Sequence, residues 1–333
     1  MNSALLALAA ALFTWGLGEG IFFFFQPLYL AELGADPLQI GAILGGAGMA
    51  MTLVHIPAGY LADRFGRRPL LRVAWAGGLV FSLIMASAST LPVFVTGLIL
   101  YSFTTFVIAP LNSYVTAARG KLSVERVITF VSAVFSLGMV LGPLLGGWLG
   151  DRFGLRSLYI AASGIFVIST VFMFSLPPQP IHDSASDFSS KKLLKNKQYL
   201  GFLALLFFII FALYLPQPLT QNFLQEERRL SLGQIGSLGS LSALGNVVLN
   251  LFLGQLGART GFLLGQFSVA LFAFLIWHGS GMELFGLGYF LLGGFRSARS
   301  LAAAHVNSLV NDAQMGLAYG LTETVSAFPL ILA

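Results

Sequence analysis

The distribution of polar residues along the chain predicts a series of membrane-spanning helices. Long, mostly apolar runs alternate with short breaks that contain charged residues, Gly or Pro. About 20 apolar residues in a helix cross the hydrocarbon core of a bilayer. The runs predict about eleven such helices, near residues 4–31, 37–62, 69–89, 91–117, 126–150, 155–177, 198–223, 232–257, 261–278, 284–310 and from 316 to the end of the chain.

The composition supports an all-α membrane protein and excludes a soluble globular domain. Hydrophobic residues make up 56% of the 333 residues and charged residues only 9%, whereas a soluble domain carries about 25% charged residues. There is no cysteine, which excludes disulfides and thiolate metal sites. No zinc-protease, nucleotide-binding or nucleophile-elbow motif occurs in the sequence. We therefore expect no enzymatic activity, no metal and no cofactor.

The basic residues predict the orientation of the helices. With a cytoplasmic N-terminus, the cytoplasmic connections hold twelve basic residues, namely Arg64, Arg67, Arg68, Arg72, Arg119, Lys121, Arg126, Lys191, Lys192, Lys195, Lys197 and Arg259. The outer connections hold four, namely Arg152, Arg156, Arg228 and Arg229. Short cytoplasmic loops carry the excess of Lys and Arg in membrane proteins. We therefore expect a multi-pass protein of the cell (inner) membrane with a cytoplasmic N-terminus, and the net charge of +5 then indicates topology, not nucleic-acid binding.

Short motifs recur along the chain and indicate two repeats. Residues 178–197 are the longest polar stretch and are predicted to be a cytoplasmic linker between residues 1–177 and 198–333. Four motifs recur at one offset of 195 residues: Gln39-Ile40-Gly41 with Gln234-Ile235-Gly236, Gly59-x-Leu61 with Gly254-x-Leu256, Arg64-x-Gly66 with Arg259-x-Gly261, and Asn112-Ser113-x-Val115 with Asn307-Ser308-x-Val310. Gln26-Pro27-Leu28 also recurs, as Gln217-Pro218-Leu219, at an offset of 191 residues. A common offset indicates two six-helix repeats in parallel orientation.

The second repeat is shorter than the first. It holds helices 7 to 11, so about eleven of twelve membrane helices are present in residues 1–333. If the repeats are equal in length, the sequence lacks most of helix 11 and all of helix 12, about 40 residues. We therefore expect that the sequence is truncated at its C-terminal end.

The most specific motif lies between the second and third predicted helices, in Gly59-Tyr60-Leu61-Ala62-Asp63-Arg64-Phe65-Gly66-Arg67-Arg68. Gly59 and Gly66 permit close helix approach and a tight reversal, and the arginines Arg64 and Arg67 anchor the cytoplasmic surface. The segment resembles the G-x-L-A-D-R-x-G-R signature of the major facilitator superfamily of secondary transporters. The resemblance covers the whole chain and implies the major facilitator fold, with two pseudo-symmetric six-helix halves.

The same resemblance assigns a role to Asp63. In the superfamily this acid caps the N-terminus of a helix in the other half and locks the outward-facing state, an interaction that the helix dipole favours. We expect its partner near Gly316, and the second repeat has Ala258 at the matching position. The alternative interpretation is a solvated basic turn.

The fifth predicted helix carries a ridge of residues without side chains. Gly138, Gly142 and Gly146 follow one another at intervals of four, which permits close helix packing, and Pro143 removes a backbone hydrogen bond and favours a kink. The pattern is similar to the helix-5 motif of the drug/proton antiporter branch, although ordinary small-residue packing is the alternative. A departure from that branch is Leu98, which stands where its fourth helix usually has an Arg.

Four ionisable residues within the predicted helices are the candidate site. Such residues cost at least about 2.5–3.5 kcal/mol each at the bilayer centre and therefore mark functional sites by default. They are Glu19 in the first helix, Arg296 and Arg299 on one face of the tenth, and Glu323 in the eleventh. Either they form a central site for solute and protons, or they form a buried structural ion network.

These residues lead to three functional hypotheses. The first is secondary active transport by alternating access, as proton-coupled efflux of a small organic molecule, with Glu19 or Glu323 carrying the proton because withdrawal from water favours a neutral carboxyl group. The second is transport of an organic anion bound by Arg296 and Arg299. The third is a transporter-like sensor or lipid-moving protein. For the first two hypotheses we expect the protein to be a monomer in the lipid bilayer. Its partner is then a small-molecule substrate, together with protons in the first hypothesis.

Overall fold

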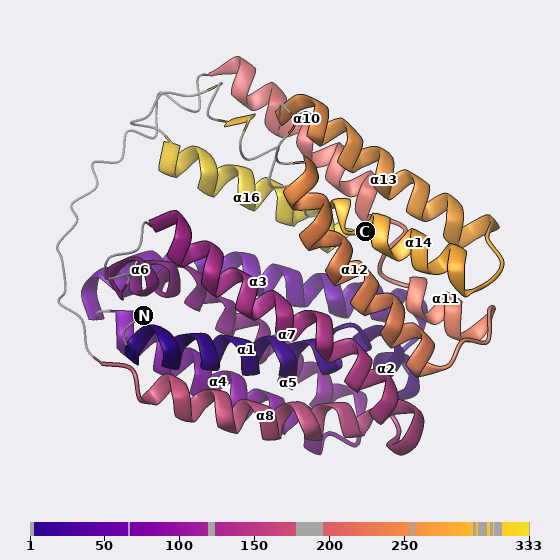
Figure 1. The fold of residues 1–333 in the computed structure, drawn as a ribbon, viewed down its shortest axis with the longest axis horizontal. Coiled ribbons are helices and arrows are strands. Elements are labelled where there is room, and N and C mark those ends of the chain that lie inside the picture. Colours follow the sequence, from indigo (N-terminus) through magenta and orange to yellow (C-terminus); the bar gives the residue numbers. More distant parts are fainter. Residues whose placement is uncertain are drawn as a thin grey trace. The chain divides into compact units, whose positions relative to one another are not determined.

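The structure is a computed structural model that describes residues 3–65, 67–118, 124–177, 196–253, 256, 258–295, 298, 305–306, 309 and 315–332, and every regular element in these residues is helical (Figure 1). The described side chains are fewer, and residues 55–65 are among those excluded. In chain order the helices are α1 (Ser3–Phe23), α2 (Gln26–Glu32), α3 (Pro37–Phe65), α4 (Arg67–Ser87), α5 (Leu91–Phe103), the 3₁₀ helix η1 (Thr104–Val107), α6 (Ile108–Ala118), α7 (Val124–Phe153), α8 (Arg156–Phe174), α10 (Lys197–Tyr214), α11 (Thr220–Glu226), α12 (Leu232–Leu253), α13 (Ala258–His278), α14 (Met282–Leu292) and α16 (Met315–Leu332).

Most of these helices have the length and composition of membrane spans. Within the described part of the chain, eight helices are long and apolar enough to cross a bilayer, and two shorter apolar helices cover Leu91–Val107 and Met282–Leu292. The prediction of an all-α membrane protein is therefore confirmed.

The chain forms two compact units. The first consists of Met1–Ser184 together with Gln221–Ser240, and the second of Ala185–Thr220 together with Leu241–Ala333. Helix α12 contributes to both units, because the first unit includes its residues up to Ser240 and the second begins at Leu241.

Two predicted helices of the first unit are interrupted. The predicted helix 4–31 ends at Phe23 and restarts as α2 at Gln26, because Pro27 has no N–H to continue the helical hydrogen bonds. The predicted helix 91–117 contains the 3₁₀ turn η1 between α5 and α6. Pro110 cannot donate to the carbonyl of Phe106, which lies in that turn. Both predictions of a continuous helix were wrong for this reason. The predicted helix 198–223 was wrong as well, because α10 ends at Tyr214 and α11 begins at Thr220, after Pro216 and Pro218.

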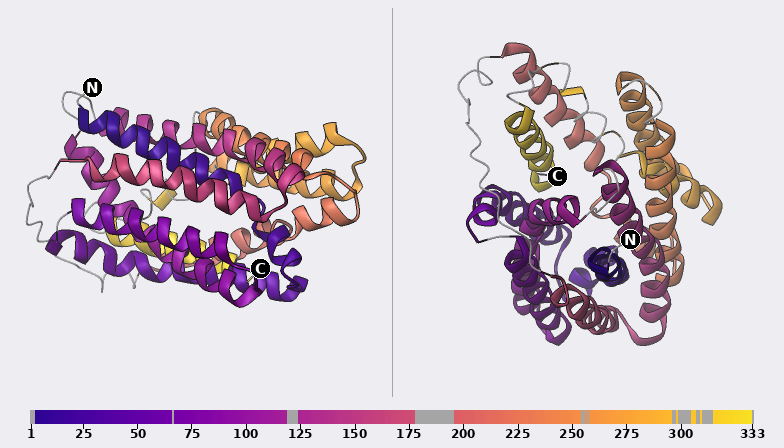
Figure 2. Two further views of the ribbon diagram at one scale, coloured as in Figure 1. Left: turned by 90° about the horizontal axis from the view of Figure 1, so that it is seen from below. Right: turned by 60° about the vertical axis from the view of Figure 1, so that its left-hand side comes forward.

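Helix α1 is the core of the first unit and packs against α7 and α8; in the right-hand view of Figure 2 it is seen close to end-on with α8 beside it. Glycines on α1 face both neighbours. A Cβ atom on Gly16 would lie 2.4 Å from the carbonyl oxygen of Phe135 in α7, and one on Gly18 would lie 2.5 Å from the Phe166 ring of α8. These distances allow no side chain, so the glycines set the spacing of the three helices.

The recurring Gln-Ile-Gly motif has a capping function in both copies. At the start of α3, the Gln39 N–H donates to Asp36 Oδ1 (2.8 Å) and the Asp36 N–H donates to Gln39 Oε1 (3.0 Å). At the start of α12, Ser231 and Gln234 make the same reciprocal pair, at 3.2 and 2.9 Å. Reciprocal bonds of this kind satisfy backbone donors that have no partner within the helix.

In the second unit α13 packs against α14, and α10 packs against α16 and α13. Tyr199 is fully buried and its hydroxyl donates to the carbonyl oxygen of Ala318 at 2.7 Å. Asn196 caps α10, because its side chain accepts a hydrogen bond from the Tyr199 N–H and donates to the carbonyl oxygen of Leu309 at 2.8 Å.

Candidate functional site

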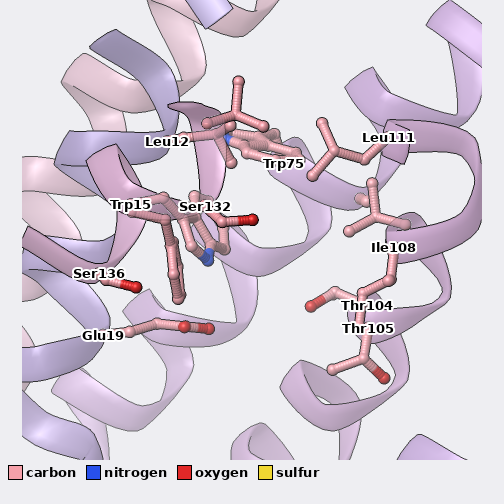
Figure 3. A pocket seen from close by; sticks show the side chains of 14 residues that line it. Leu12, Trp15, Glu19, Trp75, Thr104, Thr105, Ile108, Leu111, Ser132 and Ser136 are labelled. Carbon is pink, nitrogen blue, oxygen red and sulfur yellow. The ribbon is translucent and has the colours of Figure 1, made fainter. Parts of the chain in front are cut away.

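A cavity of about 310 Å³ lies within the first unit and includes Glu19 (Figure 3). Helices α1, α4, α6 and α7 and the 3₁₀ turn η1 contribute its lining. The lining residues are Leu12, Trp15, Glu19, Ala74, Trp75, Thr104, Thr105, Val107, Ile108, Leu111, Val131, Ser132, Phe135 and Ser136. Figure 3 shows Glu19, Ser132 and Ser136 on one side and Thr104, Thr105 and Ile108 on the other.

Glu19 is positioned by the packing of α1. Because Gly16 and Gly20 face α7 and Gly18 faces α8, the Glu19 side chain leaves the helix on the remaining face, toward the cavity. It is partly buried. The hydroxyl group of Tyr101, in α5, donates to Glu19 Oε1 at 2.7 Å. A hydrogen bond to a carboxylate stabilises its charged form, so Tyr101 holds the carboxylate in place.

Aromatic rings surround this pair. The Trp15 ring stacks on Phe166 with a centroid separation of 4.2 Å and lies 4.9 Å from the Trp75 ring. Trp75 is fixed because its Nε1–H donates to Ser169 Oγ at 2.9 Å, and the Ser169 hydroxyl donates to the carbonyl oxygen of Ala11 at 2.6 Å. These contacts form a rigid aromatic wall.

The polar groups of the cavity are hydroxyls, one carboxylate and the indole N–H groups of Trp15 and Trp75. Thr104 and Thr105 donate to the carbonyl oxygens of Tyr101 and Ser102, which leaves their oxygen atoms as hydrogen-bond acceptors. Ser132 and Ser136 lie one helical turn apart on α7. Among the lining residues Glu19 is the ionisable one, so the cavity has acidic character and suits an uncharged or cationic solute with aromatic and hydrogen-bonding groups.

The other predicted site residues are described in less detail. Arg296, Arg299 and Gly66 lie outside the described residues. Gly59, Asp63 and Arg64 belong to α3, and Glu323 to α16, but their side chains are not among those described. Arg67 is the first residue of α4. The predicted latch and the predicted grouping of four ionisable residues therefore remain predictions.

The predicted glycine ridge of α7 lies at the contact with α1. A Cβ atom would lie 2.5 Å from the Leu17 nitrogen at Gly138, 2.4 Å from the Gly20 Cα at Gly142 and 2.2 Å from the Ile21 carbonyl oxygen at Gly146. All three neighbours are backbone atoms of α1, so the two helices touch backbone to backbone. This packing fixes the position of α1, and of Glu19 with it, relative to Ser132 and Ser136 of α7, which line the same cavity.

A second stripe on α7, absent from the sequence predictions, contacts the start of α12. Gly147 would bring a Cβ atom to 2.5 Å from the Leu232 carbonyl oxygen. Asp151 accepts hydrogen bonds from the Leu232 N–H and the Gly233 N–H, both at 2.8 Å. The missed signal is a repeat at an offset of 88 residues, in which Gly147-x-Leu149-x-Asp151-Arg152-Phe153-Gly154-x-Arg156 matches Gly59-x-Leu61-x-Asp63-Arg64-Phe65-Gly66-x-Arg68.

The chain is similar in sequence to known membrane transport and resistance proteins. The chain is 27% identical over 167 residues to an uncharacterized MFS-type transporter of Methanocaldococcus jannaschii, a match covering 49% of this chain and 42% of the relative. It is 30% identical over 164 residues to the tetracycline resistance protein, class G, of Vibrio anguillarum, covering 47% and 42%. The chain thus spans about two fifths of the length of these curated relatives.

Solved structures extend the likeness to the whole chain. The nucleoside transporter NupG superposes with a TM-score of 0.84 at 17% identity, covering 99% of this chain and 89% of that one. A D-xylose-proton symporter superposes with a TM-score of 0.73 at 10% identity, covering 98% and 88%. These likenesses establish the fold. The family model of the Major Facilitator Superfamily matches residues 7–333, and the chain therefore belongs to this superfamily of membrane transporters.

Proposed function

We propose that this chain moves a small organic solute out of the cell in exchange for protons, with Glu19 as the group that binds the proton. The observation that carries the proposal is the Glu19 carboxylate in a cavity of about 310 Å³, hydrogen-bonded by Tyr101 at 2.7 Å. A carboxylate among apolar and aromatic groups is energetically costly, and an ionisable residue within a membrane helix is therefore a candidate functional residue. It can alternate between a charged form that attracts solute and a neutral form that releases it.

In this transport cycle, movement of two halves of the protein exposes the cavity alternately to each side of the membrane. We propose residues 1–177 and 198–333 as these halves, joined by a cytoplasmic linker at 178–197, with the N-terminus in the cytoplasm. Transporters of two parallel six-helix repeats rock about a central site. In this scheme the Glu19 cavity faces the two sides of the membrane in turn.

The lining favours a solute without negative charge. The stacked rings of Trp15 and Phe166 and the Trp75 ring offer flat apolar surfaces, and Ser132 and Ser136 offer hydrogen bonds. An anion would meet the Glu19 carboxylate. Tetracycline is a suitable first solute to test, because the chain is 30% identical over 164 residues to a tetracycline resistance protein.

The test is solute flux in proteoliposomes with an imposed pH gradient, made with the full-length protein. The parent protein should transport solute at a rate that depends on the gradient. Glu19→Gln keeps the shape of the side chain and removes its charge, so it should abolish or uncouple the flux. The matched control is Glu32→Gln, because Glu32 lies on α2, exposed and outside the cavity lining. Normal pH dependence in Glu19→Gln refutes the proton role of Glu19.

The same assay separates the two remaining hypotheses. Transport of an organic anion requires the positive charges of Arg296 and Arg299 and would persist in Glu19→Gln. A sensor or lipid-moving protein would show no gradient-dependent flux of any solute in the panel, while the purified protein remains folded.

A further inference from the structure

A contact between an acidic residue and a helix N-terminus lies apart from the Glu19 cavity. Asp151, near the end of α7, accepts a hydrogen bond from the Leu232 N–H through Oδ1 and from the Gly233 N–H through Oδ2, both at 2.8 Å. These are the first two N–H groups of α12, and such groups have no acceptor in their own helix. A carboxylate in this position also interacts favourably with the helix dipole.

The neighbouring basic residues contact other groups. The Arg152 guanidinium lies over the Trp148 ring, 4.8 Å from its centroid. Arg156 donates to the carbonyl oxygens of Ala86 and Ser87 at the end of α4. The Asp151 carboxylate is thus directed to the backbone of α12.

Close packing of α7 and α12 accompanies these hydrogen bonds. A Cβ atom on Gly236 would lie 2.2 Å from the Pro143 carbonyl oxygen, and one on Gly147 would lie 2.5 Å from the Leu232 carbonyl oxygen. Pro143, Gly147 and Asp151 are four residues apart and share one face of α7, as Leu232 and Gly236 share one face of α12. These residues of α7 and α12 therefore form one continuous interface, which we call the seam. The Asp151 hydrogen bonds lie at its end.

Helix α12 connects this seam to the second unit, because its residues after Ser240 belong to that unit. When the second unit moves, α12 must either leave α7 or bend. We propose that Asp151 is an outer latch: its carboxylate ties the first turn of α12 to the end of α7, and this tie breaks when the outer side of the transport pathway opens. The inference rests on the proposed transport function and on the predicted orientation, in which the connection from α7 to α8 faces outward.

The sequence around Asp151 supports a gating role. Asp151 and Asp63 occupy the same place in the repeat at an offset of 88 residues. One copy follows the second predicted helix and the other follows the fifth, so the predicted topology places the two acids on opposite sides of the membrane. An acid on each side gives the protein one latch for each closed state.

The latch can be tested by cysteine accessibility, without any solute. Residues 1–333 contain no cysteine, so Ser240→Cys introduces one thiol into this part of the chain. Ser240 is buried, lies four residues after Gly236 on the same face of α12, and its hydroxyl has no hydrogen-bond partner among the described residues. A membrane-impermeant maleimide added to intact cells should modify this thiol slowly when the seam is closed. Asp151→Ala should raise the rate by at least about fivefold, which corresponds to about 1 kcal/mol.

Two control pairs make the result specific. Asp36→Ala removes an acid that caps its own helix, through a 2.8 Å hydrogen bond from the Gln39 N–H, and should leave labelling unchanged. Gly147→Ala should raise labelling by forcing α7 away from Leu232, whereas Gly164→Ala should not, because a Cβ atom there has no neighbour within 4 Å in the part of the chain that the structure describes. The same reagent is also applied to inside-out vesicles.

Faster labelling from the outer side in Asp151→Ala and Gly147→Ala, and not in the controls, supports the latch. Unchanged labelling in both variants, with full modification after denaturation, overturns it, as does a rise confined to inside-out vesicles. The readout is independent of flux. Normal pH dependence of flux in Glu19→Gln refutes the proposed proton role of Glu19. It does not change the interpretation of the labelling rates of Ser240→Cys.

Discussion

Replacement of Gly142 by Ala tests whether the backbone contact between α1 and α7 sets the geometry of the Glu19 cavity. The added Cβ atom would lie 2.4 Å from the Gly20 Cα, 2.5 Å from the Gly20 carbonyl carbon and 2.7 Å from the Ile21 nitrogen. Carbon atoms in contact prefer separations of about 3.5–4.0 Å, so α1 and α7 must separate locally by about 1 Å. The clashing atoms belong to the α1 backbone, which cannot turn away as a side chain can.

The expected cost follows from these distances. Overpacking of this kind destabilises by about 1–3 kcal/mol, and the better helix propensity of Ala offsets at most about 1 kcal/mol. Gly164→Ala is the matched control, because the same methyl group meets no atom of the described residues within 4 Å. The two variants should therefore differ by about 1–3 kcal/mol in the free energy of unfolding, with Gly142→Ala the less stable.

The assay is unfolding of the purified full-length protein in mixed detergent micelles, followed by circular dichroism, with flux measured in parallel. Gly20 is adjacent to Glu19, so a displacement of α1 should also lengthen the 2.7 Å hydrogen bond from Tyr101 and reduce transport. Equal stability of Gly142→Ala and Gly164→Ala would refute the argument that this glycine is required for contact between α1 and α7.

Three further predictions concern single side chains. Tyr101→Phe removes the hydroxyl that holds the Glu19 carboxylate in place, so gradient-driven flux should fall severalfold; unchanged flux contradicts this role. Asp63→Asn should reduce flux severalfold at normal expression, because the neutral side chain interacts less strongly with a helix N-terminus; full flux argues for a solvated turn. Arg296→Lys and Arg299→Lys should weaken anion binding about tenfold if these residues bind solute, since Lys lacks the bidentate fork; preserved binding, measured by thermal shift, favours an ion network.

The membrane helices and their family could be predicted from the sequence because their causes are local. A bilayer requires about 20 apolar residues per helix, and the motif from Gly59 to Arg68 is specific to the superfamily, whose family model matches residues 7–333. The glycine spacing in α7 likewise indicated helix contact, because residues at intervals of four share one face. The boundaries of the two halves and the roles of the predicted site residues remain predictions.

Local prolines also explain what the prediction of helices missed. The breaks at Pro27 and before Pro110 follow from a missing backbone donor. A prediction from the pattern of apolar residues alone does not take this missing donor into account. These breaks matter for the site, because the turn at Thr104–Val107 supplies one side of the cavity.

Other features were decided by tertiary structure alone. Glu19 was predictable as an intramembrane acid, but its partner Tyr101 is 82 residues away, and the pairing depends on the glycine contacts that place α1 between α7 and α8. Asp151 could be found as the second copy of the Asp63 motif, yet its partner, the first turn of α12, is about 80 residues further along the chain. Which side chain meets which backbone group over such separations depends on how the helices pack, and the apolar pattern that commits each helix to the membrane carries no information about its neighbours.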